Sequence, residues 1–220
     1  MKPRFWMVLT LALLCLGTFT AFGASYKLET VTTVPEGLSD NLKGLLQAQG
    51  YQVVGDQGTA WCEVWIRKEL ANLSKPASRD ARYPALHTGQ LVGIMKFNAA
   101  GSDYRGQALK PGLYTMRYCL ILQDGNHLGA APILDFVLLA PVSDDSKDPE
   151  ALMATDEVVA LSRKASGTNH PAVISLSPPP SGGAALDKDD LDHWVLKVKT
   201  QSKPAADLPI GIIVVGRAEG

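Results

Sequence analysis

Hydrophobic residues recur at every second position in most apolar stretches of the chain, a pattern that predicts strands with one buried face. In residues 113–122, Tyr114, Met116 and Tyr118 fall on one face, with a mixture of polar and apolar residues on the other. Residues 193–200 alternate in the same way. By contrast, residues 209–215 are almost continuously apolar, as expected of a strand buried on both faces.

Two segments change from this period to the spacing of a helix. Leu38, Leu42 and Leu45 lie four and three residues apart, which predicts a helix over about 38–49. Gly50 would then be the residue that ends this helix.

The second predicted helix spans about 149–164. Asp148 is a suitable N-cap, Pro149 suits the first helical position, and Gly167 suits the C-terminal end. A second start at Thr155 is also compatible with the sequence, which would give two short helices.

About nine or ten strands and two helical segments, without regular strand–helix alternation, predict a mainly β fold. The expected architecture is a single antiparallel β-sandwich or jelly roll over residues 25–220. Residues 71–88 have no period and contain two prolines, so they predict a long exposed loop. Residues 177–190 are rich in proline and glycine and predict a second loop.

The N-terminus has the build of a secretory signal peptide. Lys2 and Arg4 precede an apolar run over residues 5–19, and small residues near 21–25 offer a cleavage site. A membrane anchor is the alternative, but the run is near the lower length limit for a span. Lipidation is disfavoured because Leu14 precedes Cys15. We therefore predict that residues 1–24 are removed and that the protein is exported, to the periplasm or the extracellular space.

Charge and composition narrow the choice of partners. The formal net charge is −1 and no long basic stripe is present, which argues against a nucleic-acid partner. Nothing after residue 25 is long and apolar enough to span a membrane. The expected partner is an unknown ligand, polymer or protein outside the cytoplasm, and the sequence implies no cofactor.

Export places Cys62 and Cys119 in an oxidising compartment, where a disulfide is permitted. Both residues fall within predicted strands, where buried free thiols are equally common. The sequence leaves these two states open.

Residues 123–132, QDGNHLGAAP, separate two apolar runs. Asp124, Gly125 and Asn126 are typical of a hairpin turn, because Gly and Asn tolerate positive φ. The turn does not account for His127, and loops at the ends of a rigid sheet often carry binding residues. We favour the turn and keep Asp124, Asn126 and His127 as candidate ligand-binding residues.

His170 precedes a predicted strand and could lie at the same end of the fold as His127. With Asp124 or Asp135 these histidines could form a metal site, which is the basis of an alternative function as a metal-dependent enzyme. Close metal-ligand spacings such as H-x-H are absent from the sequence, and so is the G-x-S-x-G motif of serine hydrolases. His170 and Arg163 complete the candidate ligand-binding set.

Aromatic residues suggest a different kind of site. Trp61, Trp65, Tyr104, Tyr114 and Tyr118 could stack on a ligand if exposed, or simply fill the core. On the strand over residues 60–67, Trp61, Glu63, Trp65 and Arg67 share one predicted face, which mixes aromatic and charged side chains.

Three stretches of the chain, Trp61–Leu70, Lys110–Leu139 and Ser162–Leu176, resemble an uncharacterised family of secreted bacterial β-rich proteins. The resemblance implies export and a β-rich domain. It implies no activity, substrate or catalytic residue. We therefore expect a non-catalytic binding or structural protein, with the metal-dependent enzyme as the alternative.

Overall fold

The protein was analysed as a computed structural model, which describes residues 24–72, 78–121 and 131–218. Its elements are mostly strands, with two helices, so the predicted mainly β class with two helical segments is confirmed. In chain order the elements are β1 (Tyr26–Val31), α1 (Asp40–Leu45), β2 (Gly50–Gly55), β3 (Ala60–Ile66), β4 (Glu69–Ala71), β5 (Leu91–Phe97), β6 (Gly101–Ser102), β7 (Ala108–Leu109), β8 (Gly112–Leu120), β9 (Asp135–Pro141), α2 (Thr155–Ser166), β10 (Val173–Ser177), β11 (Ala185–Lys188), β12 (Trp194–Lys203) and β13 (Ala206–Val215).

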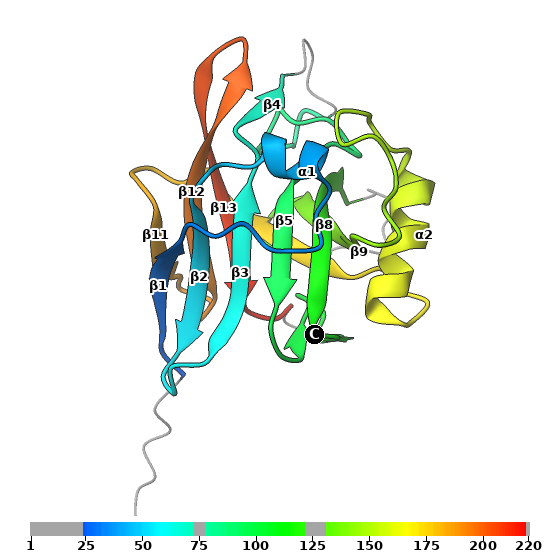
Figure 1. The fold of residues 1–220 in the computed structure, drawn as a ribbon. Coiled ribbons are helices and arrows are strands. Elements are labelled where there is room, and N and C mark those ends of the chain that lie inside the picture. The colour runs from blue at the N-terminus through cyan, green and yellow to red at the C-terminus, as the bar shows by residue number, and fades with distance from the viewer. Residues whose placement is uncertain (1–23, 73–77, 122–130, 219–220) are drawn as a thin grey trace, which may run out of the picture.

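Among the described residues, one sheet contains every strand except the short β6–β7 pair. Its order is β1-β2-β3-β5-β8-β9-β10-β13-β12-β11, and every neighbouring pair in this order is antiparallel (Figure 1). The short strand β4 pairs in parallel with the far end of β12.

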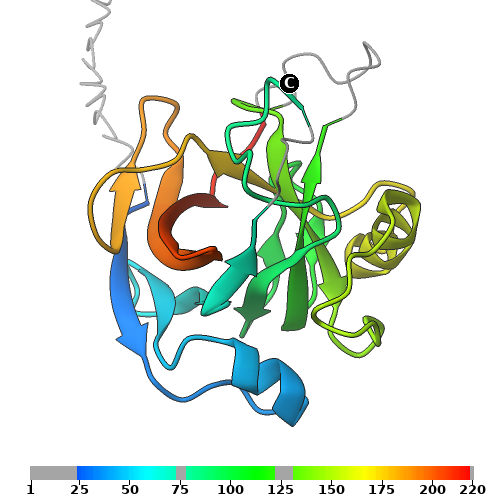
Figure 2. The ribbon, with the colours of Figure 1, turned by 90° about the horizontal axis from the view of Figure 1, so that it is seen from above.

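The sheet curls so strongly that its two end strands lie side by side. Seen from above, β1 and β11 are adjacent although they stand at opposite ends of the strand order (Figure 2). Here the ring of Tyr26 on β1 packs edge to face against the ring of Trp194 at the start of β12, the strand that pairs with β11, with centroids 5.7 Å apart. The packed layers expected of a sandwich are therefore two parts of one continuous sheet.

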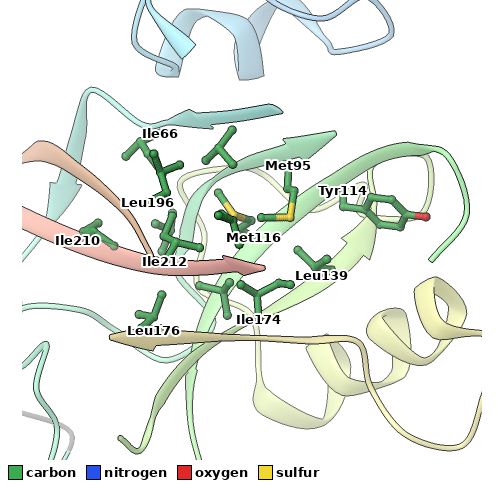
Figure 3. Close-up of a cluster of buried hydrophobic side chains, with 14 of the residues drawn as sticks. Ile66, Met95, Tyr114, Met116, Leu139, Ile174, Leu176, Leu196, Ile210 and Ile212 are labelled. Carbon is green, nitrogen blue, oxygen red and sulfur yellow. The ribbon is translucent and has the colours of Figure 1, made fainter. Parts of the chain in front are cut away.

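The interior of the curl is filled by apolar side chains from nearly all the long strands. Figure 3 shows Met95, Met116, Leu139, Ile174 and Ile212 from five different strands meeting there. All five are at most 2% exposed. Burying such side chains stabilises the fold by about 1.5–3 kcal/mol each, so this cluster is the main source of stability.

Helix α1 is shorter than predicted. Ser39 caps it by accepting a hydrogen bond from the backbone N–H of Leu42, and the helix ends at Leu45. Leu46 is already extended and pairs with Arg67. Gly50, expected to end the helix, instead begins β2.

Helix α2 begins at Thr155, the second start that the sequence allowed, rather than at Pro149, and it packs on the outer side of β9. Asp148 forms a turn rather than a helical cap, since its side chain accepts from the N–H of Glu150 and its carbonyl from Ala151. The predicted end is confirmed, because Gly167 follows the helix with φ +67°. Neither helix of the described chain is long and apolar enough to cross a membrane.

Residues 78–88 form a loop with several exposed residues, as expected, but two of its side chains anchor it in the core. Tyr83 and Leu86 are each 1% exposed. The Tyr83 hydroxyl donates to the carbonyl of Ser177 (2.7 Å) and accepts from the N–H of Gly211 (2.9 Å). These bonds fasten the loop to β10 and β13.

Cys62 and Cys119, the cysteines of the described residues, are both free and buried. Cys62 points into the interior cluster, whereas Cys119 lies in the cluster under α2 on the outer side of the sheet. Strand β5 separates their strands in the sheet order. Two strand spacings of about 4.8 Å exceed the roughly 7 Å limit for a disulfide, so the fold keeps the thiols apart.

The segment over residues 177–190 also contains more order than its composition suggested. Residues 178–184 form the predicted loop, but Ala185–Lys188 form β11, which pairs with the start of β12. Strand β11 thereby supplies one end of the curled sheet.

Candidate functional site

The outer face of β3 carries the mixed set of side chains noted in the sequence. Glu63 and Trp65 lie along it, and Arg67 continues the alternation one residue past the end of the strand. Trp65 is covered by Leu38 and Leu42 and is fully buried. The polar residues Glu63 and Arg67 thus lie on either side of a covered tryptophan.

Trp61 does not share this face. A β-bulge shifts the register between β2 and β3, so that Val53 pairs with Cys62 while Val54 pairs with Ala60. The extra residue turns Trp61 toward the interior, where its indole N–H donates to the carbonyl of Val214 (2.7 Å). A bulge re-aims the side chains of one strand in this way.

A hollow of about 640 Å³ lies beside Glu63. The chain between β1 and α1 crosses the outer face of β2, β3 and β5 (Figure 1), and residues 30–36 form one wall. Glu63 of β3 and Lys96 of β5 line the other side. The exposed side chains of Thr30, Thr32 and Thr33 open this hollow to solvent.

Glu63 is the centre of the polar contacts at the hollow, and the residue is only 7% exposed. The ammonium group of Lys96 lies 3.3 and 3.4 Å from its two carboxylate oxygens. The amide of Asn98 donates to the same carboxylate at 2.6 Å, and that of Gln52 at 3.4 Å. These donors satisfy the hydrogen-bonding capacity of a carboxylate that is largely removed from water.

Of the two charged residues, Glu63 and Lys96, the lysine is the more accessible to a ligand. About a third of its side chain is exposed, and the ammonium group carries three donors. Together with the threonine hydroxyls, it gives the hollow hydrogen-bonding groups suited to a small polar ligand. The sequence contained a signal for this residue, because Lys96 is a charge within the apolar strand GIMKF.

The aromatic residues proposed for ligand stacking are buried. Trp65, Tyr104, Tyr114 and Tyr118 are each at most 5% exposed. Strands prefer aromatic residues for packing, and this preference accounts for these four. They offer no stacking surface.

A second polar cluster surrounds His193, which is 2% exposed. Its Nδ1 lies 3.0 Å from the carboxylate of Asp189, and its Nε2 lies 3.3 Å from the carbonyl of Arg217 and 3.5 Å from the Tyr104 hydroxyl. An Asp–His pair can orient a general base, but here the base faces a carbonyl and a buried tyrosine. The contacts tie the turn before β12 to the residues after β13.

The structure describes two of the five predicted ligand-binding residues. Asp124, Asn126 and His127 lie outside the described residues. Arg163 and His170 are both exposed, in the last turn of α2 and in the segment that follows it. The backbone carbonyl of His170 accepts from the Ser166 and Thr168 hydroxyls, which fixes this segment.

Asp135, the other carboxylate considered for a metal site, is a structural anchor. It is fully buried and accepts hydrogen bonds from the backbone N–H groups of Arg82 and Tyr83 and from the Tyr118 hydroxyl. Within residues 24–72, 78–121 and 131–218, no three His, Cys, Asp or Glu side chains form a group able to hold a metal ion.

Comparison of the chain with protein-family models, with curated proteins and with solved structures finds no match.

Proposed function

We propose that the protein is exported and binds a small polar ligand without transforming it, in the hollow over Glu63 and Lys96. The observation that carries this proposal is a largely buried carboxylate that holds a partly exposed ammonium group at the wall of that hollow. The signal-like N-terminus and the resemblance to secreted β-rich proteins support the export.

The buried ionisable groups support binding rather than catalysis. Burial raises the pKa of the Cys119 thiol to about 12, so the thiolate needed of a nucleophile is scarce at neutral pH. Burial raises the pKa of Cys62 further still. Asp135 and His193 are engaged in contacts that fasten loops.

A ligand panel tests the proposal. We would titrate the chain from Ser25 onward with neutral sugars, amino acids and dicarboxylates by calorimetry. At least one should bind with a dissociation constant below about 1 mM, equivalent to about 4 kcal/mol. Lys96→Met should weaken that binding at least tenfold.

The matched control is Lys27→Met, which removes an exposed lysine of β1 outside the lining of the hollow. It should leave binding unchanged. If no panel member binds, or if both variants weaken binding equally, the hollow is not the site. Loss of binding in Arg163→Ala and His170→Ala instead would move the site to the end of α2.

Export is tested separately. The full chain expressed in a bacterium should be recovered outside the cytoplasm and should begin near residue 25 by N-terminal sequencing. Recovery of the unprocessed chain in the cytoplasm would contradict this part of the proposal. Metal analysis of the same material, with His127→Ala alongside, tests the alternative of a metal-dependent enzyme.

A further inference from the structure

Arg67 lies just past the end of β3 and is buried, with 5% of the residue exposed. Its Nη1 donates to the carbonyl of Pro149 (3.1 Å), and its Nη2 donates to the carboxylate of Glu150. Both partners belong to the connection between β9 and α2. A buried guanidinium requires partners for its donors, because an unpaired buried donor is costly.

The Nε of Arg67 has no hydrogen-bond partner among the described residues, and the same is true of the neighbouring Trp65 Nε1. Arg117 shows what a complete pairing looks like in the same molecule. Its Nε and Nη2 contact the two oxygens of Asp145 at 2.7 and 3.0 Å, so that one carboxylate fills one edge of the guanidinium. The corresponding edge of Arg67 is only half filled.

Glu150 differs from Asp145 in how firmly it is held. The side chain of Asp145 is 1% exposed, whereas that of Glu150 is 60% exposed. An exposed carboxylate can leave its partner at little cost, because water solvates it. Glu150 is therefore a replaceable partner for Arg67.

A second cation is close to the same position. Lys203, at the end of β12, forms an ion pair with Glu69 (2.7 Å). The pKa of Lys203 is raised, first by its hydrogen bond and charge interaction with Glu69 and further by the charge of Glu150, while Arg67 opposes the shift. Glu69 follows Arg67 by two residues, and the Thr200 hydroxyl of β12 donates to the Arg67 carbonyl at 2.6 Å, so Lys203 is held on the segment that runs beside Arg67.

We propose that Arg67 and Lys203 form a binding site for an external carboxylate, and that the side chain of Glu150 occupies this site when no external carboxylate is bound. The planar guanidinium edge matches the two oxygens of a carboxylate, and Lys203 adds a second positive charge. An incoming carboxylate displaces Glu150 and pairs with both Nε and Nη2. The site lies across Trp65 from the hollow at Glu63 and does not depend on the function proposed for that hollow.

Removal of the internal carboxylate provides the test. In Glu150→Ala, sodium acetate should raise the melting temperature saturably, relative to sodium chloride at equal ionic strength. The Nε–H resonance of Arg67 should shift over the same concentration range. The wild type should need at least tenfold more acetate for half of the effect, because Glu150 competes.

The control variant is Glu157→Ala. It removes an exposed carboxylate of α2 that forms an ion pair with Lys147. It should respond to acetate no more than to chloride. Arg67→Lys in the Glu150→Ala background keeps the charge but loses the planar edge, and should abolish the acetate response. If that double variant does not fold, the resonance shift of Arg67 in Glu150→Ala decides the question.

Two results would overturn the proposal. One is an equal response to acetate and chloride in Glu150→Ala, without a shift of the Arg67 resonance. The other is a stronger response to phosphate than to acetate, which would assign the site to a different anion. Half-saturation by N-acetylglycylglycine at a lower concentration than by acetate would identify a peptide C-terminus as the source of the carboxylate.

Discussion

Gly89 and Met153 approach so closely that a Cβ atom on Gly89 would lie 1.8 Å from the carbonyl oxygen of Met153. Gly89 also has a φ of +80°, in the left-handed region that favours glycine. Its carbonyl accepts from the N–H of Met153, and its N–H donates to the carbonyl of Tyr118. This glycine therefore joins β8 to the segment that leads into α2.

Gly89→Ala should destabilise the protein by about 2–5 kcal/mol, because the left-handed backbone and the steric overlap both oppose it. Gly182→Ala is the matched control, since Gly182 has a φ of +91° and no atom within 4 Å of its added Cβ. It should cost only about 1–2 kcal/mol. Urea denaturation of both variants measures the difference, and equal losses would show that the contact with Met153 is unimportant.

Asp145→Asn should lower the free energy of unfolding by about 3–5 kcal/mol, because it leaves the Arg117 guanidinium buried without a counter-charge. The neighbouring Asp144→Asn removes an exposed ion pair with Lys164 and should cost less than about 1 kcal/mol. Chemical denaturation at neutral pH compares the two. A small effect of Asp145→Asn would mean that water reaches Arg117.

The thiols provide a test of the separation between Cys62 and Cys119. The chain from Ser25 onward, purified under oxidising conditions, should show no reactive thiol when folded. It should show two in denaturant without reductant, because Cys62 and Cys119 face opposite sides of the sheet. A thiol reagent such as dithionitrobenzoate measures both states. Appearance of the thiols only after reduction would indicate a disulfide and contradict this arrangement.

The alternating pattern predicted the strands well where each strand is regular. Tyr114, Met116 and Tyr118 of β8 all face the interior, as their spacing indicated. The pattern did not predict that the other face of β8 is buried too. That burial depends on Asp145, a loop residue that neutralises Arg117, and alternation within one strand cannot indicate such a partner.

The candidate site was only partly predictable. Alternation placed Glu63 and Arg67 on one face, but the bulge that turns Trp61 inward leaves no mark in the sequence. The hollow also depends on the path of residues 30–36 across the sheet, which is a tertiary feature. Composition likewise suggested that the loop at 71–88 is exposed throughout. The burial of Tyr83 could not be predicted, because it depends on partners in β10 and β13 that are distant in the sequence.

Alkaline pH should destabilise the protein through groups that the fold keeps protonated. Burial is the largest cause that raises the pKa of Cys119, from 9.0 to about 12. Burial also raises the pKa values of Cys62, Tyr83 and Tyr118. In the unfolded chain these groups lose their protons at their ordinary pKa values, whereas in the folded chain they retain them.

Between those two values the unfolded state binds fewer protons than the folded state, so stability falls as pH rises. For Cys119 the window runs from about pH 9 to about pH 12. The stabilising contribution is fully present below pH 9 and is lost across this window. Each group contributes at most about 1.4 kcal/mol per pH unit.

Urea denaturation at intervals from pH 7.5 to pH 10.5 measures this dependence. The free energy of unfolding should be nearly constant to about pH 8.5 and should then fall, first through the thiols and above about pH 10 also through the tyrosines. Cys119→Ala should show a shallower fall, even if it is less stable at pH 7.5. A profile that stays level to pH 10.5, or the same slope in Cys119→Ala as in the wild type, would show that this thiol ionises as readily in the folded protein as in the unfolded chain.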